Sequence, residues 1–296
     1  MYKEVAINPE CMAHEEYYFL IKRETGYEKG RYLVADIKAW ADEAYPYVES
    51  SKMRTMKKKS VKNFLNKLKK SRKNEHFAMP GDRKGEHAVC WFDWWEHQCE
   101  LRRFDATLCE DRRKGTICID DVIESHVDWE IPPSTVLRRD SVEIVDLVES
   151  LLNISSKLLI VDQYFSFSHN PTLVELISRL RRCNSLKSVH VVTSIKPDNP
   201  QHVYNNEYSG IMPSEVGLRV TLVPERYFHD RYLITDSGAL KAGHGFKEQA
   251  DQGAPSDNLS INLMSKAEVD LVQEGLKKAY DDEKATDIFS YGQGMR

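Results

Sequence analysis

One segment of the 296-residue chain, Phe228–Phe246 (FHDRYLITDSGALKAGHGF), gathers residue types that take part in chemistry. His229 and Arg231 enter an apolar stretch, Asp236 follows the arginine by five positions, and Gly243–His244–Gly245 begins seven positions after that acid. A hydrophilic triplet that enters an apolar strand is the arrangement expected of a catalytic residue held by a rigid element. An imidazole with an unperturbed pKa of about 6.5 is available in its neutral, nucleophilic form near neutral pH.

The spacing resembles the signature of the phospholipase D superfamily: His-x-Lys, four residues, Asp, six residues, Gly, then Ser or Thr. His229, Arg231, Asp236 and Gly243 match it with both gaps preserved. The runs KLLIVDQYF, VHVVTSI and LRVTLV look like strands of that fold, and Asp257 lies where small bacterial endonucleases of the superfamily have an acid that orients the histidine. The resemblance covers roughly residues 141–265 and implies an α/β domain with a central mixed sheet flanked by helices.

The chemistry that the resemblance implies is phosphodiester cleavage through a covalent phosphohistidine, without a metal or other cofactor. His229 would be the nucleophile, and Asp257 would fix its tautomer. Arg231 and His244 would stabilise the charge that develops on phosphate. Substrate contacts would come from Asp236, Gly243 and Gly245, although an acid at a strand end, such as Asp236, is equally typical of a turn cap.

Two residues depart from the signature. Arg231 replaces the lysine, but arginine keeps the positive charge and offers a fork that can hold two phosphate oxygens. His244 replaces Ser or Thr and can donate a hydrogen bond to phosphate instead. The glycines beside it leave room for a ligand to approach the backbone.

Cleavage also requires a second histidine to protonate the leaving oxygen. The chain carries one copy of the motif, and in single-motif members of the superfamily each of two chains contributes one histidine. The resemblance therefore implies a C₂ homodimer with the two His229 side chains facing each other across its axis. A different partner chain is the alternative source of the second histidine.

The elements that must position this segment follow from apolar periodicity and cap residues. Helices are predicted over Ser141–Leu152, from Pro171 onward, and from a Ser265–Glu268 capping box to about Tyr280. Strands are predicted at Lys157–Phe165, Ser188–Ile195, Gly217–Val223, Arg231–Thr235, Ala239–Ala242 and Asn258–Met264. Helices that alternate with apolar strands indicate a layered α/β domain.

The first part of the chain reads differently. Length predicts two domains, and the proline pair in WEIPPS places their boundary near Pro133, giving an α+β domain over 1–132 and a phosphodiesterase domain over 133–296. Strands are expected at Glu100–Cys109 and Gly115–Ile119. The cluster Trp91, Trp94 and Trp95 indicates core packing, with stacking on bases as the alternative. Cys90, Cys99, Cys109 and Cys118 recur every nine or ten residues near His97, which is typical of successive strands or, alternatively, of a metal site.

The net charge of −4 conceals a strongly basic run. Eleven Lys or Arg residues and no acid lie between Lys52 and Lys73, whereas the chain from Ser141 onward carries 16 basic and 21 acidic residues. Val61, Phe64, Leu65 and Leu68 form a helical stripe that would place the lysines outward. Such a helix favours nucleic-acid binding through Lys57, Lys58, Lys59 and Lys62, because phosphate contacts release counterions. A solvated helix face and a membrane-surface helix are the alternatives.

These features favour a nuclease that acts on DNA or RNA. The motif variant also resembles that of uncharacterised bacterial proteins that we associate with phage defence. A non-catalytic platform for phosphate recognition or dimerisation is one alternative, and a phospholipase or phosphatidyl transferase is another. The chain has no apolar run near the roughly 20 residues that cross a bilayer and no secretory pattern at its start, so a cytoplasmic protein is expected.

Overall fold

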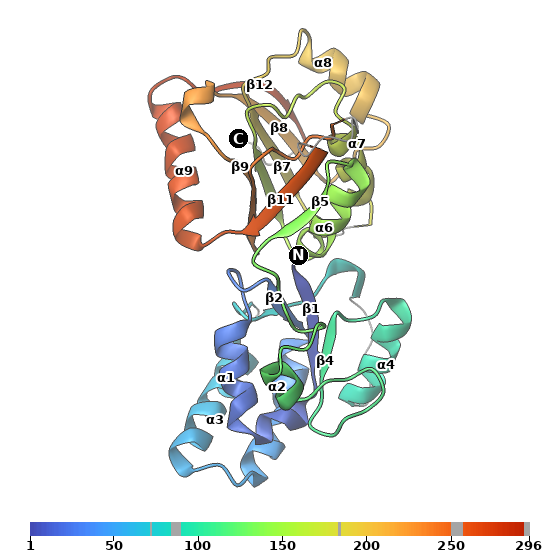
Figure 1. Cartoon of the computed structure of the whole chain (residues 1–296), viewed down its shortest axis with the longest axis vertical. Coiled ribbons are helices and arrows are strands. Elements are labelled where there is room, and N and C mark those ends of the chain that lie inside the picture. Colours follow the sequence, from blue (N-terminus) through green and yellow to red (C-terminus); the bar gives the residue numbers. More distant parts are fainter. Residues whose placement is uncertain (72, 84–89, 183–184, 250–256, 293–296) are drawn as a thin grey trace. The chain divides into compact units, whose positions relative to one another are not determined.

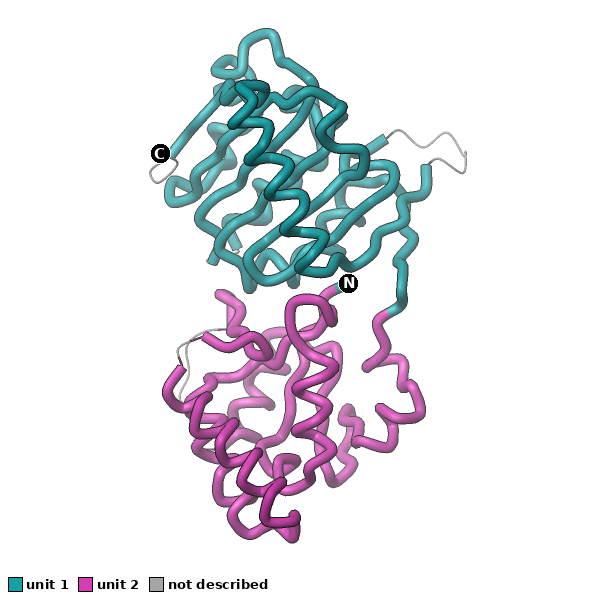
Figure 2. Tube along the Cα trace, turned by 90° about the vertical axis from the view of Figure 1, so that its left-hand side faces the viewer, with its two compact units in different colours: residues 1, 132–296 teal, residues 2–131 magenta. Residues whose placement is uncertain are grey.

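The computed structural model describes residues 1–296 except 72, 84–89, 183–184, 250–256 and 293–296, so Arg72 of the basic run lies outside the described residues. The chain divides into two compact units, one formed by Tyr2–Ile131 and the other by Pro132–Arg296 together with Met1 (Figure 2). Each unit contains its own β-sheet (Figure 1). None of the helices within the described residues is both long and apolar enough to span a bilayer.

The N-terminal unit is built on a four-stranded sheet in the order β3-β2-β1-β4, and each of these pairings is parallel. Its elements are β1 (Lys3–Ile7), α1 (Glu15–Glu24), β2 (Arg31–Val34), α2 (Ile37–Ser50), α3 (Thr55–Lys70), β3 (Phe77–Ala78), α4 (Trp91–Leu101), β4 (Ala106–Leu108) and α5 (Ile119–Ile123). The predicted stripe on α3 is confirmed, because Val61, Phe64, Leu65 and Leu68 are all buried in the core of this unit.

Two strand predictions in this unit were wrong. Glu100 and Leu101 end the helix α4, so the strand expected over Glu100–Cys109 shrinks to β4. Gly115–Ile119 contributes only an isolated bridge from Ile117 to Leu108 before α5 begins. In α4, Trp91 and Trp95 lie four positions apart and stack with ring centroids 6.1 Å apart, a contact that helical spacing provides.

The cysteines do not lie on successive strands. Cys99 belongs to α4, and Cys90 and Cys118 are the residues that precede α4 and α5. Within the described parts of the chain, no group of three or more His, Cys, Asp or Glu side chains is arranged to hold a metal ion. The tryptophans pack as expected: Trp91 is buried, and Trp94 and Trp95 lie partly buried against the same core.

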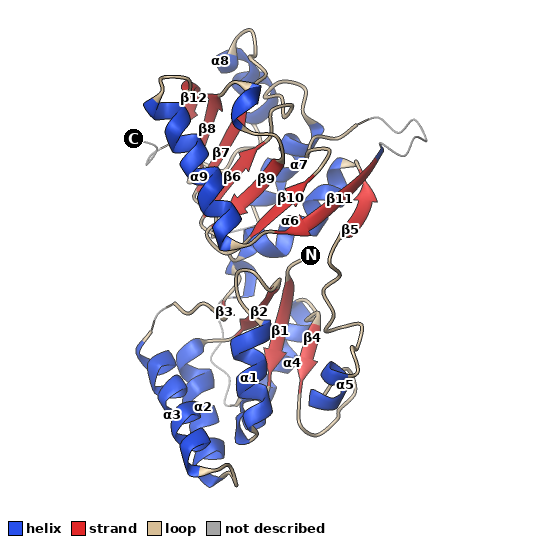
Figure 3. Ribbon diagram, turned by 60° about the vertical axis from the view of Figure 1, so that its left-hand side comes forward, coloured by secondary structure: helices blue, strands red, loops and turns tan. Residues whose placement is uncertain are grey.

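The C-terminal unit confirms the predicted layered fold class. Its eight-stranded sheet has the order β12-β8-β7-β6-β9-β10-β11-β5. Strands β6, β7 and β8 are parallel, and the remaining pairings are antiparallel. Helix α9 covers one face, and α6 and α7 cover the other (Figure 3). The elements are β5 (Thr135–Arg138), α6 (Ser141–Asn153), β6 (Lys157–Val161), α7 (Pro171–Leu180), β7 (Ser188–Thr193), α8 (Pro200–Val203), β8 (Gly217–Leu222), β9 (Arg231–Thr235), β10 (Ala239–Ala242), β11 (Asn258–Leu263), α9 (Lys266–Asp281) and β12 (Thr286–Tyr291).

Local caps explain where the helices of this unit begin. Asn170 accepts a hydrogen bond from Leu173 N before the first-turn proline of α7. The predicted capping box is present before α9, where Ser265 and Glu268 bond each other's backbone N–H. These caps set the residues at which α7 and α9 begin, and these two helices cover the sheet.

A polar network around the buried Thr221 joins β7, β8 and β12 in this sheet. His190 Nε2 lies 2.7 Å from Thr221 Oγ1, and Thr221 donates to Asp287 Oδ1 (2.6 Å). Burial, assisted by the positive charge of Arg219, lowers the pKa of His190 from 6.5 to about 4. The folded state therefore holds this imidazole neutral.

This shift makes the stability of the unit depend on pH. The contribution of His190 is complete above about pH 6.5, where the unfolded histidine is also neutral, and it is lost as the pH falls toward 4. We expect this group to cost up to about 3 kcal/mol of unfolding free energy over that range, at about 1.36 kcal/mol per pKa unit. Urea denaturation at pH 7 and pH 4 should therefore show a smaller loss for His190→Gln than for the wild type. Equal losses would contradict the prediction.

Candidate active site

The candidate residues meet at one edge of the large sheet because of the strand directions. In the β6–β9 pair, Val161 lies opposite Tyr232, so Asp162, which follows β6, lies beside Arg231 at the start of β9. In the β11–β5 pair, Asn258 lies opposite Arg138, which brings Asp257 beside the residue that follows β5. Strand ends that are far apart in the sequence thus converge on one edge.

The two histidines of the motif flank the β9–β10 pair at this edge. Arg231, the first residue of β9, lies opposite Ala242, the last residue of β10. His229 therefore lies two residues before β9, and His244 lies two residues after β10. Both histidine side chains are exposed. The site therefore presents two imidazoles to solvent from the segments that precede β9 and follow β10.

Arg231 holds the glycine-containing segment in place. Its Nη1 donates to the carbonyl oxygen of Gly243 (2.6 Å), and its guanidinium carbon lies 5.3 Å from the ring centroid of Tyr164. The Nε atom is buried and has no hydrogen-bond partner among the described residues. The side chain is half-buried, so its charge is only partly screened by water.

Asp162 is the buried counter-charge of the site. Its Oδ2 accepts from Phe246 N and its Oδ1 from Tyr164 N, both at 2.9 Å. Burial raises the pKa of Asp162, whereas these two hydrogen bonds and the charges of Arg231 and Arg139 oppose that rise. The carboxyl group therefore anchors the chain directly after the Gly–His–Gly turn to the end of β6.

Gly245 cannot carry a side chain in this turn. Its φ is +89°, and an added Cβ would lie 2.5 Å from Asp162 Oδ2. Close approach of the backbone to the anchoring carboxylate, together with the left-handed conformation, explains the glycine.

Gly245→Ala is expected to lower the unfolding free energy by about 2 kcal/mol, of which the left-handed conformation costs about 1–2 kcal/mol and the clash with Asp162 the remainder. Gly243→Ala is the matched control, since Gly243 has a negative φ and an added Cβ would meet nothing within 4 Å. Its effect should stay within about 0.5 kcal/mol. Chemical denaturation of both variants tests the prediction, and similar losses at the two positions would contradict it.

Arg139 is a functional candidate that the sequence did not reveal. Its backbone N–H donates to Asp257 O (2.8 Å), and its side chain donates to Lys247 O (3.3 Å) and to Gln249 Oε1. Burial lowers the pKa of Arg139, the charge of Arg231 adds to this effect, and Asp162 and Asp257 oppose it. The guanidinium groups of Arg139 and Arg231 thus lie at the same end of the sheet, and their positive charges favour binding of an anion there. In the sequence, Arg139 is marked only as half of the pair Arg138–Arg139 before α6. That pair does not reveal that β5 lies beside β11.

The remaining predicted residues lie as follows. Asp257 is buried at the start of β11, and its orienting role toward His229 stays a prediction. Asp236 lies at the opposite end of β9, where it accepts from Ser156 N (2.8 Å), Ser156 Oγ (2.6 Å) and Lys157 N (3.2 Å). Burial opposes ionisation of Asp236, but these hydrogen bonds outweigh it and lower its pKa. The structure therefore places Asp236 as a cap between β9 and β6, away from the other candidates.

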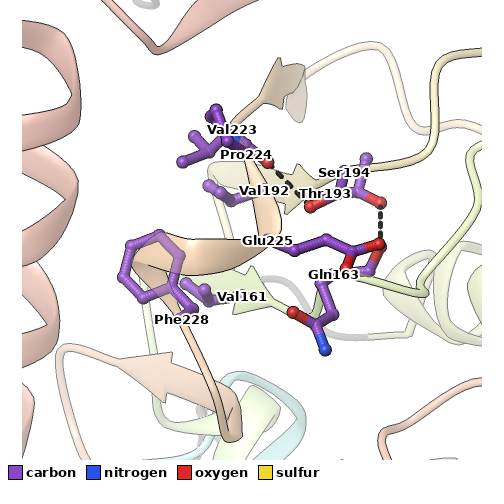
Figure 4. Close-up of a pocket in the computed structure, with 9 residues that line it drawn as sticks. All are labelled: Val161, Gln163, Val192, Thr193, Ser194, Val223, Pro224, Glu225 and Phe228. Atoms are coloured by element: carbon purple, nitrogen blue, oxygen red, sulfur yellow. Dashed lines mark hydrogen bonds between the residues drawn. The ribbon is translucent and has the colours of Figure 1, made fainter.

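A small, open hollow with a cavity volume of about 10 Å³ lies at the ends of β6, β7 and β8 (Figure 4). Phe228, the neighbour of His229, forms one wall, and Val161, Val192 and Val223 line the interior. Ser194 Oγ donates to Val223 O (2.7 Å), which fixes the loop after β7. Phe228 is thus the residue of the motif segment that lines the hollow.

The four lysines predicted to bind substrate belong to α3 in the N-terminal unit, and three of them are engaged there. Lys57 pairs with Glu15 (3.3 Å), and Lys62 pairs with Glu49 (2.6 Å). Lys58 Nζ donates to the carbonyl oxygens of Ser51 (2.6 Å) and Glu49 (3.1 Å). Lys59 is exposed. The acids missing from the helix itself are thus supplied by neighbouring elements.

No protein-family model and no curated protein matches the chain. Among solved structures, the chain is similar to Nuc, a phospholipase D family member from Salmonella typhimurium, with 17% identity and a TM-score of 0.30 over 54% of this chain and 99% of that one. It is also similar to TrmBL2, an archaeal chromatin protein described with a novel mode of DNA binding. That likeness has 15% identity and a TM-score of 0.31 over 81% of this chain and 85% of that one.

Proposed function

We propose that this protein is a metal-independent phosphodiesterase that hydrolyses nucleic acids through a phosphohistidine on His229. The observation that carries the proposal is the end of the sheet where two half-buried guanidinium groups, those of Arg231 and Arg139, interact, with the exposed His229 two residues before Arg231 in the chain. A nucleophile beside paired cations is suited to a phosphodiester, whose charge must be neutralised before an electron-rich atom can attack.

The reaction would proceed in two steps. A neutral imidazole nitrogen of His229 attacks phosphorus, the bond to the leaving oxygen breaks, and that oxygen takes a proton from a general acid. Water then attacks the phosphohistidine, its proton returns to the general acid now acting as base, and the P–N bond breaks. Arg231 and Arg139 stabilise the negative charge on the phosphate oxygens in both steps.

The general acid requires a second imidazole. We assign it to the equivalent histidine of a second copy in a C₂ homodimer, and the exposed side chain of His229 is accessible to such a copy. His244 of the same chain is a second candidate, since its side chain is exposed on the segment that follows β10, the strand paired with β9.

The test is to incubate the purified protein with plasmid, single-stranded DNA and RNA in EDTA. Cleavage that persists in the chelator supports the proposal. Binding of these substrates without cleavage would overturn it in favour of a non-catalytic phosphate-binding module. Hydrolysis of phosphatidylcholine vesicles with no cleavage of nucleic acid would instead indicate a phospholipase.

A further inference from the structure

The cations of helix α3 fall into two sets that differ in what they contact. The anchored set consists of Lys57, Lys58, Lys62 and Lys69. Lys69 pairs with Asp42 (2.9 Å) and lies over the ring of Tyr45 (4.4 Å to the centroid), just as Lys57 lies over Phe19 (4.2 Å). These contacts hold α3 against α1 and α2. Acids already pair with Lys57, Lys62 and Lys69, and Lys58 donates to backbone carbonyl oxygens.

The free set consists of Lys59, Lys67 and Lys70. All three are exposed, and none makes an ion pair or hydrogen bond with a residue that the structure describes. Asn63 and Asn66 are exposed between them. Positions 59, 63, 66, 67 and 70 recur at helical spacing, so these five residues form one outward face, which we call the free face.

We infer that the free face of α3 binds the phosphate backbone of a nucleic acid, an inference that rests on the proposed function for its choice of substrate. Lys59 and Lys70 are eleven residues apart, which on a helix is about 16 Å, or roughly five steps of a nucleic-acid strand. Lysine ammonium and asparagine amide groups both donate to phosphate oxygens without reading sequence. The helix itself contributes no acid that would repel the backbone.

The same face is poorly suited to a membrane. An interfacial helix must present a row of large apolar side chains to the lipid. In α3 those side chains are Val61, Phe64, Leu65 and Leu68, and all four are buried in the core of the unit. Met56 is the one large apolar residue that the described helix exposes.

The two sets allow a matched experiment. Lys59→Gln/Lys67→Gln/Lys70→Gln removes three free charges, and Lys57→Gln/Lys62→Gln/Lys69→Gln removes three anchored charges from the same helix. Both are compared in the His229→Ala background, so that the nucleic acid stays intact. Binding to a fluorescent duplex and to a single-stranded RNA is measured by anisotropy from 50 to 200 mM salt, with thermal denaturation in parallel.

The free-set variant is expected to bind the duplex on the order of 100-fold more weakly at 0.1 M salt, with a log–log salt slope that falls by about 0.9 per lost phosphate contact. The anchored-set variant should keep affinity within a few-fold and lose thermal stability instead. Equal losses of affinity in the two variants would overturn the inference, because binding would then depend on the net charge of the helix and not on which lysines are free. Unchanged affinity in the free-set variant would overturn it too, as would loss of binding to phosphatidylserine vesicles without loss of nucleic-acid binding.

Failure of this inference is distinguishable from failure of the proposed function. Hydrolysis of bis(p-nitrophenyl) phosphate, a small phosphodiester that lacks the extended backbone the free face is proposed to bind, should be unchanged in the free-set variant made without the His229 substitution. Loss of that activity would show that the substitutions act on the catalytic edge and not on backbone binding.

Discussion

His229→Ala is expected to reduce hydrolysis of nucleic acid in EDTA by at least about 10⁴-fold, the size of effect seen when a covalent nucleophile is removed. Because the side chain is exposed, its loss should change the unfolding free energy by no more than about 0.5 kcal/mol. Affinity for the substrate should be retained, since the two guanidinium groups remain. The measurement combines single-turnover cleavage, anisotropy and thermal denaturation of the same preparation.

His169→Asn provides the control for His229→Ala. His169 is also exposed, and its backbone φ of 50° is one that asparagine tolerates. This variant should cleave at the wild-type rate. If His229→Ala retained activity within tenfold of the wild type, the assignment of His229 as nucleophile would be rejected.

Arg231→Ala is expected to lower kcat for a small phosphodiester by about 10²–10³-fold, the cost of removing one group that stabilises charge in the transition state. Arg231→Lys should recover most of that loss, because a lysine keeps the positive charge at this position. The hydrogen bond to Gly243 O also depends on this side chain, so the thermal midpoint of each variant must be measured alongside.

The split between kcat and KM distinguishes catalysis from substrate binding at Arg231. A change in KM alone for Arg231→Ala would mean that the guanidinium contributes equally to ground-state and transition-state binding. An equal loss of kcat in the Ala and Lys variants would mean that the fork geometry, and not the charge, is required. Either result would contradict the role proposed for the charge.

The sequence predicted best those elements whose pattern is local. β9 and β10 begin and end at the predicted residues, and the buried stripe of α3 follows its spacing. Strand β12 was missed because its residues are mostly exposed and it follows directly on a helix. Strand β5 was missed because it is short, alternates between partial and full exposure, and follows two prolines.

The candidate site was predictable in its motif and not in its surroundings. His229, Arg231 and His244 share one stretch of chain, so their spacing alone marks them. Arg139 joins them only because β5 pairs with β11, a contact that no local pattern encodes. The ion pairs of Lys57 and Lys62 could not be predicted either, because their partners Glu15 and Glu49 belong to other helices.

The position of β5 at the end of the sheet also bears on how the protein folds. Arg138 and Asn258, which lie opposite each other in the β5–β11 pair, are 120 positions apart in the chain. Closing so long a loop costs entropy that is recovered only after the intervening strands have formed. Arg139 is therefore expected to reach Asp257, Lys247 and Gln249 late in folding. A nascent or partly folded chain would then have His229, the proposed nucleophile, and Arg231 before it has Arg139, the second cation proposed for phosphate.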